Sequence, residues 1–93
     1  MANIAKMVDP RDDDFGAVIN CAVRYALGRR SYMPEIVVNF TVPLVHELTN
    51  KTLWAIRRDI AEAQERDMLG DPCDAKDWLR LLAAVEKELS DRT

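Results

Sequence analysis

The sequence predicts an all-α fold, a compact bundle of three to four helices, from three observations. Its 93 residues suffice for one hydrophobic core but not for two. Only three glycines and four prolines are present, which is little material for tight hairpin turns. Apolar residues recur at three- and four-residue spacing, the period of a helix with one buried face. We therefore expect a single helical domain over residues 12–90, preceded by a loose arm over residues 1–11.

The first helix is predicted over residues 13–28. Asp12 and the two acids after it suit the positive N-terminal end of a helix, and Gly28 suits the residue that terminates one. Gly16 has no side chain and permits close approach of a neighbouring element. The apolar surface of this helix is wider than one stripe, which indicates either a central helix or one shared with another chain.

The second helix is predicted over residues 34–48, with Pro34 in its first turn and Glu35 near its positive end. Pro43 has no amide hydrogen, so the helix is expected to kink or restart there. The β-branched run within Ile36 to Val42 leaves a short strand open as the alternative.

The third helix is predicted over residues 50–69. Thr49 and Asn50 supply its cap, and Gly70 ends it. Trp54 and Met68 are expected to widen its inner face.

The fourth helix is predicted over residues 74–89, with Asp74 as its cap and fraying of residues 90–93. Its apolar stripe is the cleanest in the chain. The inner faces of all four helices together give the predicted core. The predicted core residues are Phe15, Val18, Ile19, Ala22, Ile36, Phe40, Leu44, Leu53, Ile56, Ile60, Trp78, Leu82 and Val85.

Charge and hydropathy limit the partners. Sixteen acidic residues against 13 basic ones give a net charge of −3, the wrong sign for a strongly basic nucleic-acid binder. A local basic patch remains compatible with this value. No signal peptide and no run of about 18 apolar residues is present. We therefore expect a cytoplasmic protein that has no membrane partner.

The residues that enzymes use are scarce. His46 is the only histidine, and Cys21 and Cys73 do not form a C-x-x-C pair. We interpret the two thiols as buried or idle; a disulfide between them stays open, although the expected compartment argues against it. No glycine-rich phosphate loop is present. The sequence therefore predicts a protein that is not an enzyme, with no catalytic residues, no metal ligands and no cofactors.

The densest local pattern is Cys21 to Pro34, CAVRYALGRRSYMP, where Arg24, Arg29 and Arg30 gather at the end of the first helix without an acid among them. Cations there complement the partial negative charge of a helix C-terminus, which explains them without any ligand. Guanidinium groups also bind carboxylates and stack on rings. We therefore name Arg24, Arg29, Arg30 and Tyr32 as candidate residues for binding a protein partner.

A helix-turn-helix is the alternative. The first helix of this motif would be Leu44 to Leu48, and its turn would be Thr49-Asn50. The helix that follows would present Lys51, Thr52, Arg57 and Arg58 to a nucleic-acid groove and phosphates. The acids that follow on the same helix would repel phosphates, which makes nucleic acid the less favoured partner.

The segment R-Y-A-L-G-R-R-x-Y, here Arg24 to Tyr32, resembles small helical proteins of unknown function encoded by phages and prophages. The similarity extends through T-L-W-A-I-R-R-D-I, which ends at Ile60, and through L-G-D-P with a downstream Trp78. Such small phage proteins often bind a host or phage macromolecule, and anti-CRISPR and other anti-defence inhibitors are one such class. The resemblance carries over no catalytic residue.

These observations together predict a non-enzymatic interaction protein that binds a host or phage protein, with defence inhibition as one expected role. Besides the helix-turn-helix, a structural phage component that forms oligomers is a further alternative. The broad apolar surface of the first helix also suggests a homodimer.

Overall fold

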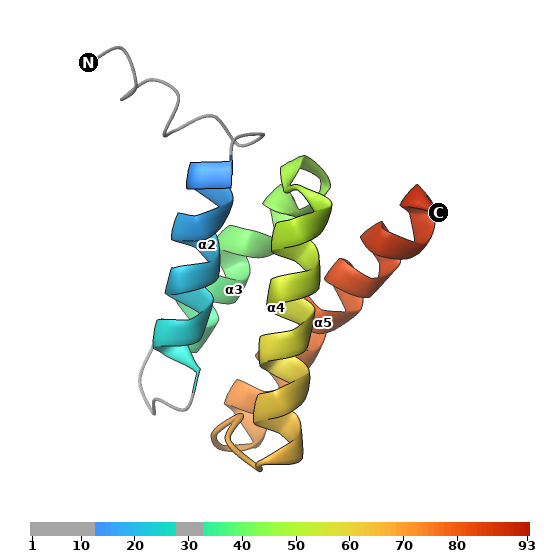
Figure 1. Cartoon of the computed structure of the whole chain (residues 1–93). Coiled ribbons are helices and arrows are strands. Elements are labelled where there is room, and N and C mark those ends of the chain that lie inside the picture. Colours follow the sequence, from blue (N-terminus) through green and yellow to red (C-terminus); the bar gives the residue numbers. More distant parts are fainter. Residues whose placement is uncertain (1–12, 28–32) are drawn as a thin grey trace, which may run out of the picture.

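Four α-helices form a closed bundle in the computed structural model, which describes residues 13–27 and 33–93 (Figure 1). Their order along the chain is α2 (Asp13–Ala26), α3 (Met33–Thr41), the short 3₁₀ helix η1 (Val42–Glu47), α4 (Asn50–Glu65) and α5 (Pro72–Arg92). Helix α2 packs on α3 and α4, and α5 packs on the other sides of the same two helices. The predicted all-α bundle is confirmed, and the predicted arm over residues 1–11 lies outside the described residues.

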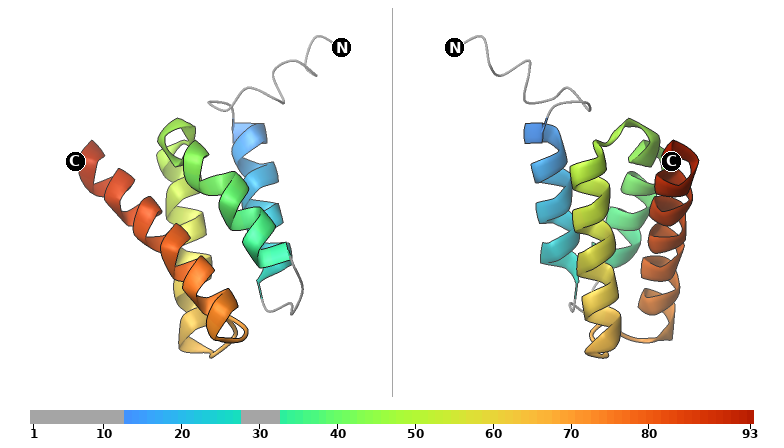
Figure 2. Two further views of the ribbon diagram at one scale, coloured as in Figure 1. Left: turned by 180° about the vertical axis from the view of Figure 1, so that it is seen from behind. Right: turned by 45° about the vertical axis from the view of Figure 1, so that its right-hand side comes forward.

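The two views of Figure 2 show how the four helices are arranged. Helices α2 and α4 lie side by side, and α3 crosses the bundle between α2 and α5. Helix α5 diverges from α4 toward its C-terminal end (Figure 1). Within the described residues no strand occurs, so the strand alternative for Ile36 to Val42 is wrong. In that same part of the chain, no helix is both long and apolar enough to cross a membrane.

The predicted break at Pro43 is confirmed in a specific form. The chain is α-helical to Thr41 and continues as the 3₁₀ helix η1, with Pro43 in its first turn. Because Pro43 cannot donate a backbone hydrogen bond, the α-helical ladder ends here and the tighter 3₁₀ winding takes over.

The helix ends follow local capping chemistry. Thr49 Oγ1 accepts a hydrogen bond from the Thr52 amide at 3.2 Å and caps α4, as predicted. The cap of α5 is Asp71, whose carboxylate accepts the Asp74 amide at 2.9 Å, so the prediction that Asp74 is the cap is wrong. Helix α4 ends four residues earlier than predicted, and Gly70 has a φ of +93° in the connection that follows.

The last residues of α5 are helical to Arg92, so the prediction that residues 90–93 fray is wrong. The Arg92 guanidinium donates to Glu88 Oε2 at 2.9 Å, to Asn50 Oδ1 at 2.8 Å and to the His46 carbonyl at 3.1 Å. One side chain thus ties the C-terminal turn of α5 to the end of η1 and the start of α4.

The core lies between the four helices, with Trp78 fully buried at its centre. Its other apolar members are Ile19, Val23, Ala26, Val37, Val38, Val45, Leu48, Leu53, Ile56, Ile60, Ala63, Leu69, Leu81, Val85 and Leu89. Of the predicted core residues, Phe15, Ala22, Leu44 and Leu82 are only half-buried.

Three predicted core residues are wrong. Val18 is 58% exposed, and Ile36 and Phe40 are each 59% exposed. Helix α3 instead buries Val37, Val38 and Thr41. Because α3 is apolar nearly all round, its sequence does not fix which side turns inward.

Candidate functional site

Arg24 lies in the last turn of α2 and points over α4. Its side chain is 66% exposed, and its Nε lies 3.9 Å from Asp59 Oδ2. The Asp59 side chain is only 11% exposed and also accepts a hydrogen bond from Asn20 Nδ2 at 3.1 Å. Arg58 Nε approaches the other Asp59 oxygen at 3.6 Å. Asp59 therefore holds α2 against α4 and orients Arg24, while most of the Arg24 side chain stays open to solvent.

An open hollow of about 240 Å³ surrounds this arginine. It is lined by Arg24, Leu27, Asp59, Glu62, Ala63, Arg66 and Met68. Met68 is half exposed, so an apolar side chain lies beside two guanidinium groups and two carboxylates. Arginine and methionine are enriched where proteins bind one another, and this hollow combines both.

The other candidate partner-binding residues are Arg29, Arg30 and Tyr32, and they lie outside the described residues. Leu27, the last described residue before them, is half-buried and lines the hollow. By chain position alone, Arg29 and Arg30 follow Leu27 by two and three residues.

The candidate nucleic-acid residues lie on different sides of α4. Lys51 and Arg58 are exposed and lie seven residues apart, about two turns along one face. Arg57 turns toward α5, where its Nε donates to Glu86 Oε2 at 3.2 Å. The structure therefore brings Lys51 and Arg58 to a common face and separates Arg57 from them.

Thr52 is buried rather than presented to solvent. Its side chain is 6% exposed and its hydroxyl lies 3.2 Å from Thr49 Oγ1. The close neighbour is Gly16 of α2, because a Cβ placed on Gly16 would overlap the Thr52 hydroxyl. The predicted close approach at Gly16 is confirmed, and Thr52 is the residue that makes it.

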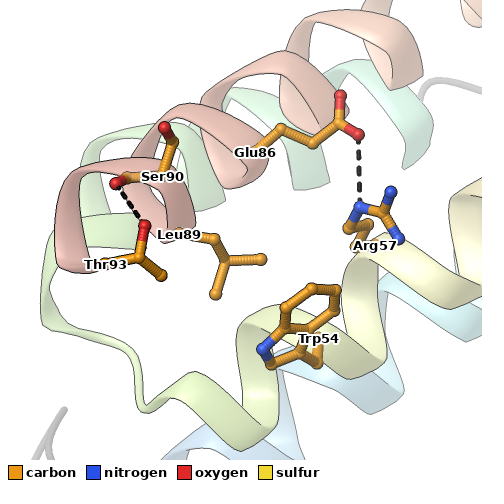
Figure 3. A pocket seen from close by; sticks show the side chains of 6 residues that line it. All are labelled: Trp54, Arg57, Glu86, Leu89, Ser90 and Thr93. Atoms are coloured by element: carbon orange, nitrogen blue, oxygen red, sulfur yellow. Dashed lines mark hydrogen bonds and ion pairs between the residues drawn. The ribbon is translucent and has the colours of Figure 1, made fainter.

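A second hollow, of about 270 Å³, opens between α4 and α5 where the two helices diverge (Figure 3). Its lining residues are Trp54, Arg57, Glu86, Leu89, Ser90 and Thr93. The Arg57 guanidinium lies 5.3 Å from the centre of the Trp54 ring, a cation–π distance. Glu86 holds the same guanidinium from the α5 side, as Figure 3 shows. Trp54 is thus kept in place while 53% exposed.

Trp54 and Met68 are surface residues that sequence reasoning placed on the inner face of the third helix; that prediction is wrong. The buried positions of α4 include Leu53, Ile56 and Ile60. Trp54 lies about 150° around the helix from the middle of that stripe, at about 100° per residue. The sequence does contain one local indication that Trp54 is exposed, which is Arg57 three residues further on. An exposed indole and a guanidinium at this spacing on a helix can contact each other.

Within residues 13–27 and 33–93, no three His, Cys, Asp or Glu residues are grouped to hold a metal ion. Cys21 and Cys73 are free thiols and both are exposed, so of the two expectations, buried or idle, the buried one is wrong. His46 is exposed, with its Nε2 3.8 Å from Glu47.

Comparisons of this chain with protein-family models, with curated proteins and with solved structures found no match. The functional argument below therefore depends on the residues and their geometry.

Proposed function

We propose that this chain is a non-enzymatic interaction protein that binds a host or phage protein through the arginine-bearing end of α2. The observation that carries the proposal is the hollow beside Arg24. It brings two arginines and an exposed methionine to one open surface. The chain adds Arg29, Arg30 and Tyr32 directly after that helix.

The electrostatics of this surface favour a partner that presents carboxylates beside an apolar side chain. Asp59 is already engaged by Asn20, Arg24 and Arg58, so its charge is balanced within the chain. In the lining of the hollow two arginines stand against two carboxylates, so the excess positive charge at this end of α2 comes from Arg29 and Arg30, which follow in the sequence. Guanidinium groups bind carboxylates in paired hydrogen bonds. Leu27 and Met68 provide the apolar contact beside them.

The resemblance of the Arg24 to Tyr32 segment to phage proteins suggests the biological setting. In that setting the partner is a component of the host or of the phage, and inhibition of a host defence such as CRISPR is the role we propose. The helix-turn-helix alternative is less well supported, since Thr52 is buried and Arg57 is held by Glu86.

Paired arginine substitutions test the proposal. The variant Arg29→Ala with Arg30→Ala is expected to bind the captured partner protein at least tenfold more weakly than the unsubstituted chain. Its thermal unfolding temperature should change little, because surface charges contribute only tenths of a kcal/mol to stability. The measurement is the dissociation constant by biolayer interferometry, alongside thermal unfolding.

The matched control is Lys51→Ala with Arg57→Ala, which removes the same charge from α4 and leaves Asp59 and its contacts in place. This variant should keep its affinity for the partner. If the control loses affinity and the Arg29/Arg30 variant does not, the binding surface lies on α4 and the proposal is wrong.

A further inference from the structure

Trp54 of α4 is a large aromatic side chain that the proposed binding at the end of α2 does not use. Trp78, the other tryptophan, is fully buried in the core, whereas Trp54 is 53% exposed. Tryptophan and arginine are enriched among the residues that dominate the binding energy of protein interfaces. Trp54 is therefore a candidate contact for a ligand.

Contacts from two helices fix the Trp54 side chain. The Arg57 guanidinium lies 5.3 Å from the centre of the indole ring. Glu86 of α5 in turn accepts a hydrogen bond from Arg57 Nε at 3.2 Å (Figure 3). Because Arg57 is held from both sides, the indole is ordered before any ligand arrives. Binding then loses less free energy to the ordering of side chains.

The hollow beside Trp54 carries no net charge. It lies between α4 and α5 and is here called the α4–α5 hollow; its lining is Trp54, Arg57, Glu86, Leu89, Ser90 and Thr93. The charged residues of this lining, Arg57 and Glu86, pair with each other. Leu89 is 8% exposed and supplies apolar surface across from the indole (Figure 3). An uncharged apolar group therefore fits this lining better than a carboxylate, a phosphate or an ammonium group.

The indole N–H of Trp54 is a free hydrogen-bond donor. Figure 3 shows the indole nitrogen on the edge of the ring that points away from Arg57. Within residues 13–27 and 33–93, this N–H donates to no other group. An indole N–H can only donate. A group that covers Trp54 therefore needs an acceptor, such as a carbonyl oxygen, beside its apolar surface.

The size and shape of the α4–α5 hollow favour a polypeptide segment. Its volume is about 270 Å³, whereas pockets that enclose small organic molecules usually have about 300–1,000 Å³. The hollow opens where α4 and α5 diverge, so a chain can pass across it and place one side chain between Trp54 and Leu89 (Figure 3).

We propose that the α4–α5 hollow binds an extended, proline-bearing segment of a partner protein. A proline ring is apolar and uncharged, as the lining requires. In the polyproline II conformation the backbone forms no internal hydrogen bonds, so a carbonyl beside the proline is free to accept from Trp54 Nε1. Aromatic side chains at a protein surface bind such segments because the conformation of the segment is already formed. This site is separate from the arginine-bearing end of α2 and does not depend on the proposed function.

NMR titration of the isotopically labelled chain with an acetylated and amidated hexaproline peptide tests the proposal. The indole N–H resonance of Trp54 should shift with a dissociation constant below about 1 mM, a weak peptide contact. The indole resonance of Trp78 should stay in place, because Trp78 is fully buried. A control hexapeptide of alanine and glutamine should bind at least fivefold more weakly.

Substitutions locate the contact, with the backbone amides of residues 86–93 as the readout. Trp54→Phe keeps an aromatic ring but removes the N–H donor, and it should raise the dissociation constant at least threefold. Arg57→Ala frees the indole and should also raise the constant several-fold. The matched control is Leu79→Ala, since Leu79 is an exposed apolar residue of α5 outside the hollow. This control should leave the constant unchanged.

A Trp54 indole resonance that does not move with up to about 5 mM hexaproline would overturn the proposal, and so would equal binding of the control peptide. A shift with single-stranded oligothymidine but not with hexaproline would make the hollow a base-stacking site and would also overturn it. The variant Arg29→Ala with Arg30→Ala should bind hexaproline as the unsubstituted chain does. A failure here is thereby distinguished from a failure of the proposed function.

Discussion

At the scale of single residues, the contact between α2 and α4 depends on two small residues, Gly16 and Thr52. Gly16 is buried, and a Cβ there would lie 3.2 Å from Thr52 Cβ and would overlap the Thr52 hydroxyl. Sequence alone showed that Gly16 permits a close approach, but it could not name the neighbour. Thr52 lies 36 positions away, and only the packing of the two helices brings them together.

Gly16→Ala tests this contact. In an open helix the change would stabilise the chain by about 1 kcal/mol, but here we expect it to destabilise the fold by about 1–3 kcal/mol through overpacking. The thermal unfolding temperature should fall by roughly 4–8 °C for each kcal/mol lost, for a chain of this size.

The partner substitution Thr52→Ala identifies the cause. In the double variant the cost of Gly16→Ala should shrink, with a coupling energy of at least about 0.5 kcal/mol in a double-mutant cycle. A Gly16→Ala chain that is more stable than the original would show that the helices do not approach as described.

At the scale of secondary-structure elements, the amphipathic patterns predicted where helices form better than they predicted which side of each helix is buried. Helix α5 has a clean stripe, and its predicted inner residues Trp78 and Val85 are buried. Helix α3 has apolar side chains nearly all round, so its sequence could not decide between burying Ile36 and Phe40 or burying Val37 and Val38. Packing against α2 and α5 made that choice.

The C-terminal turn of α5 depends on Arg92, which bonds to Glu88 on the same helix and also to Asn50 and His46, both more than 40 positions away in sequence. Arg92→Ala should destabilise the fold by about 1–2 kcal/mol, because its side chain is 26% exposed and makes several hydrogen bonds from a charged group, and such bonds contribute at this level. Amide exchange in the last turn of α5 should also speed up.

Lys87→Ala is the matched control, since Lys87 pairs with Asp91 on the same helix and its side chain is 80% exposed. It should change stability by less than about 0.5 kcal/mol. Equal effects of the two substitutions would mean that Arg92 does not anchor the helix.

At the scale of the whole molecule, charged and apolar surfaces are separated. Charged residues gather on α4 and α5, Val18, Ile36 and Phe40 are exposed on α2 and α3, and the hollow beside Arg24 lies between α2 and the end of α4. The sequence predicted the bundle and named Arg24 as a candidate residue for binding a protein partner. It could not predict the hollow, because Met68 and Arg66 reach Arg24 only through the packing of α2 on α4.

The most direct test of the central claim is affinity capture from a bacterial lysate with the tagged chain, in nuclease-treated and untreated halves. We predict that the same protein partner is retained in both halves and is lost with Arg29→Ala and Arg30→Ala together. Retention of nucleic acid alone, falling steeply as salt rises, would contradict the claim and favour the helix-turn-helix.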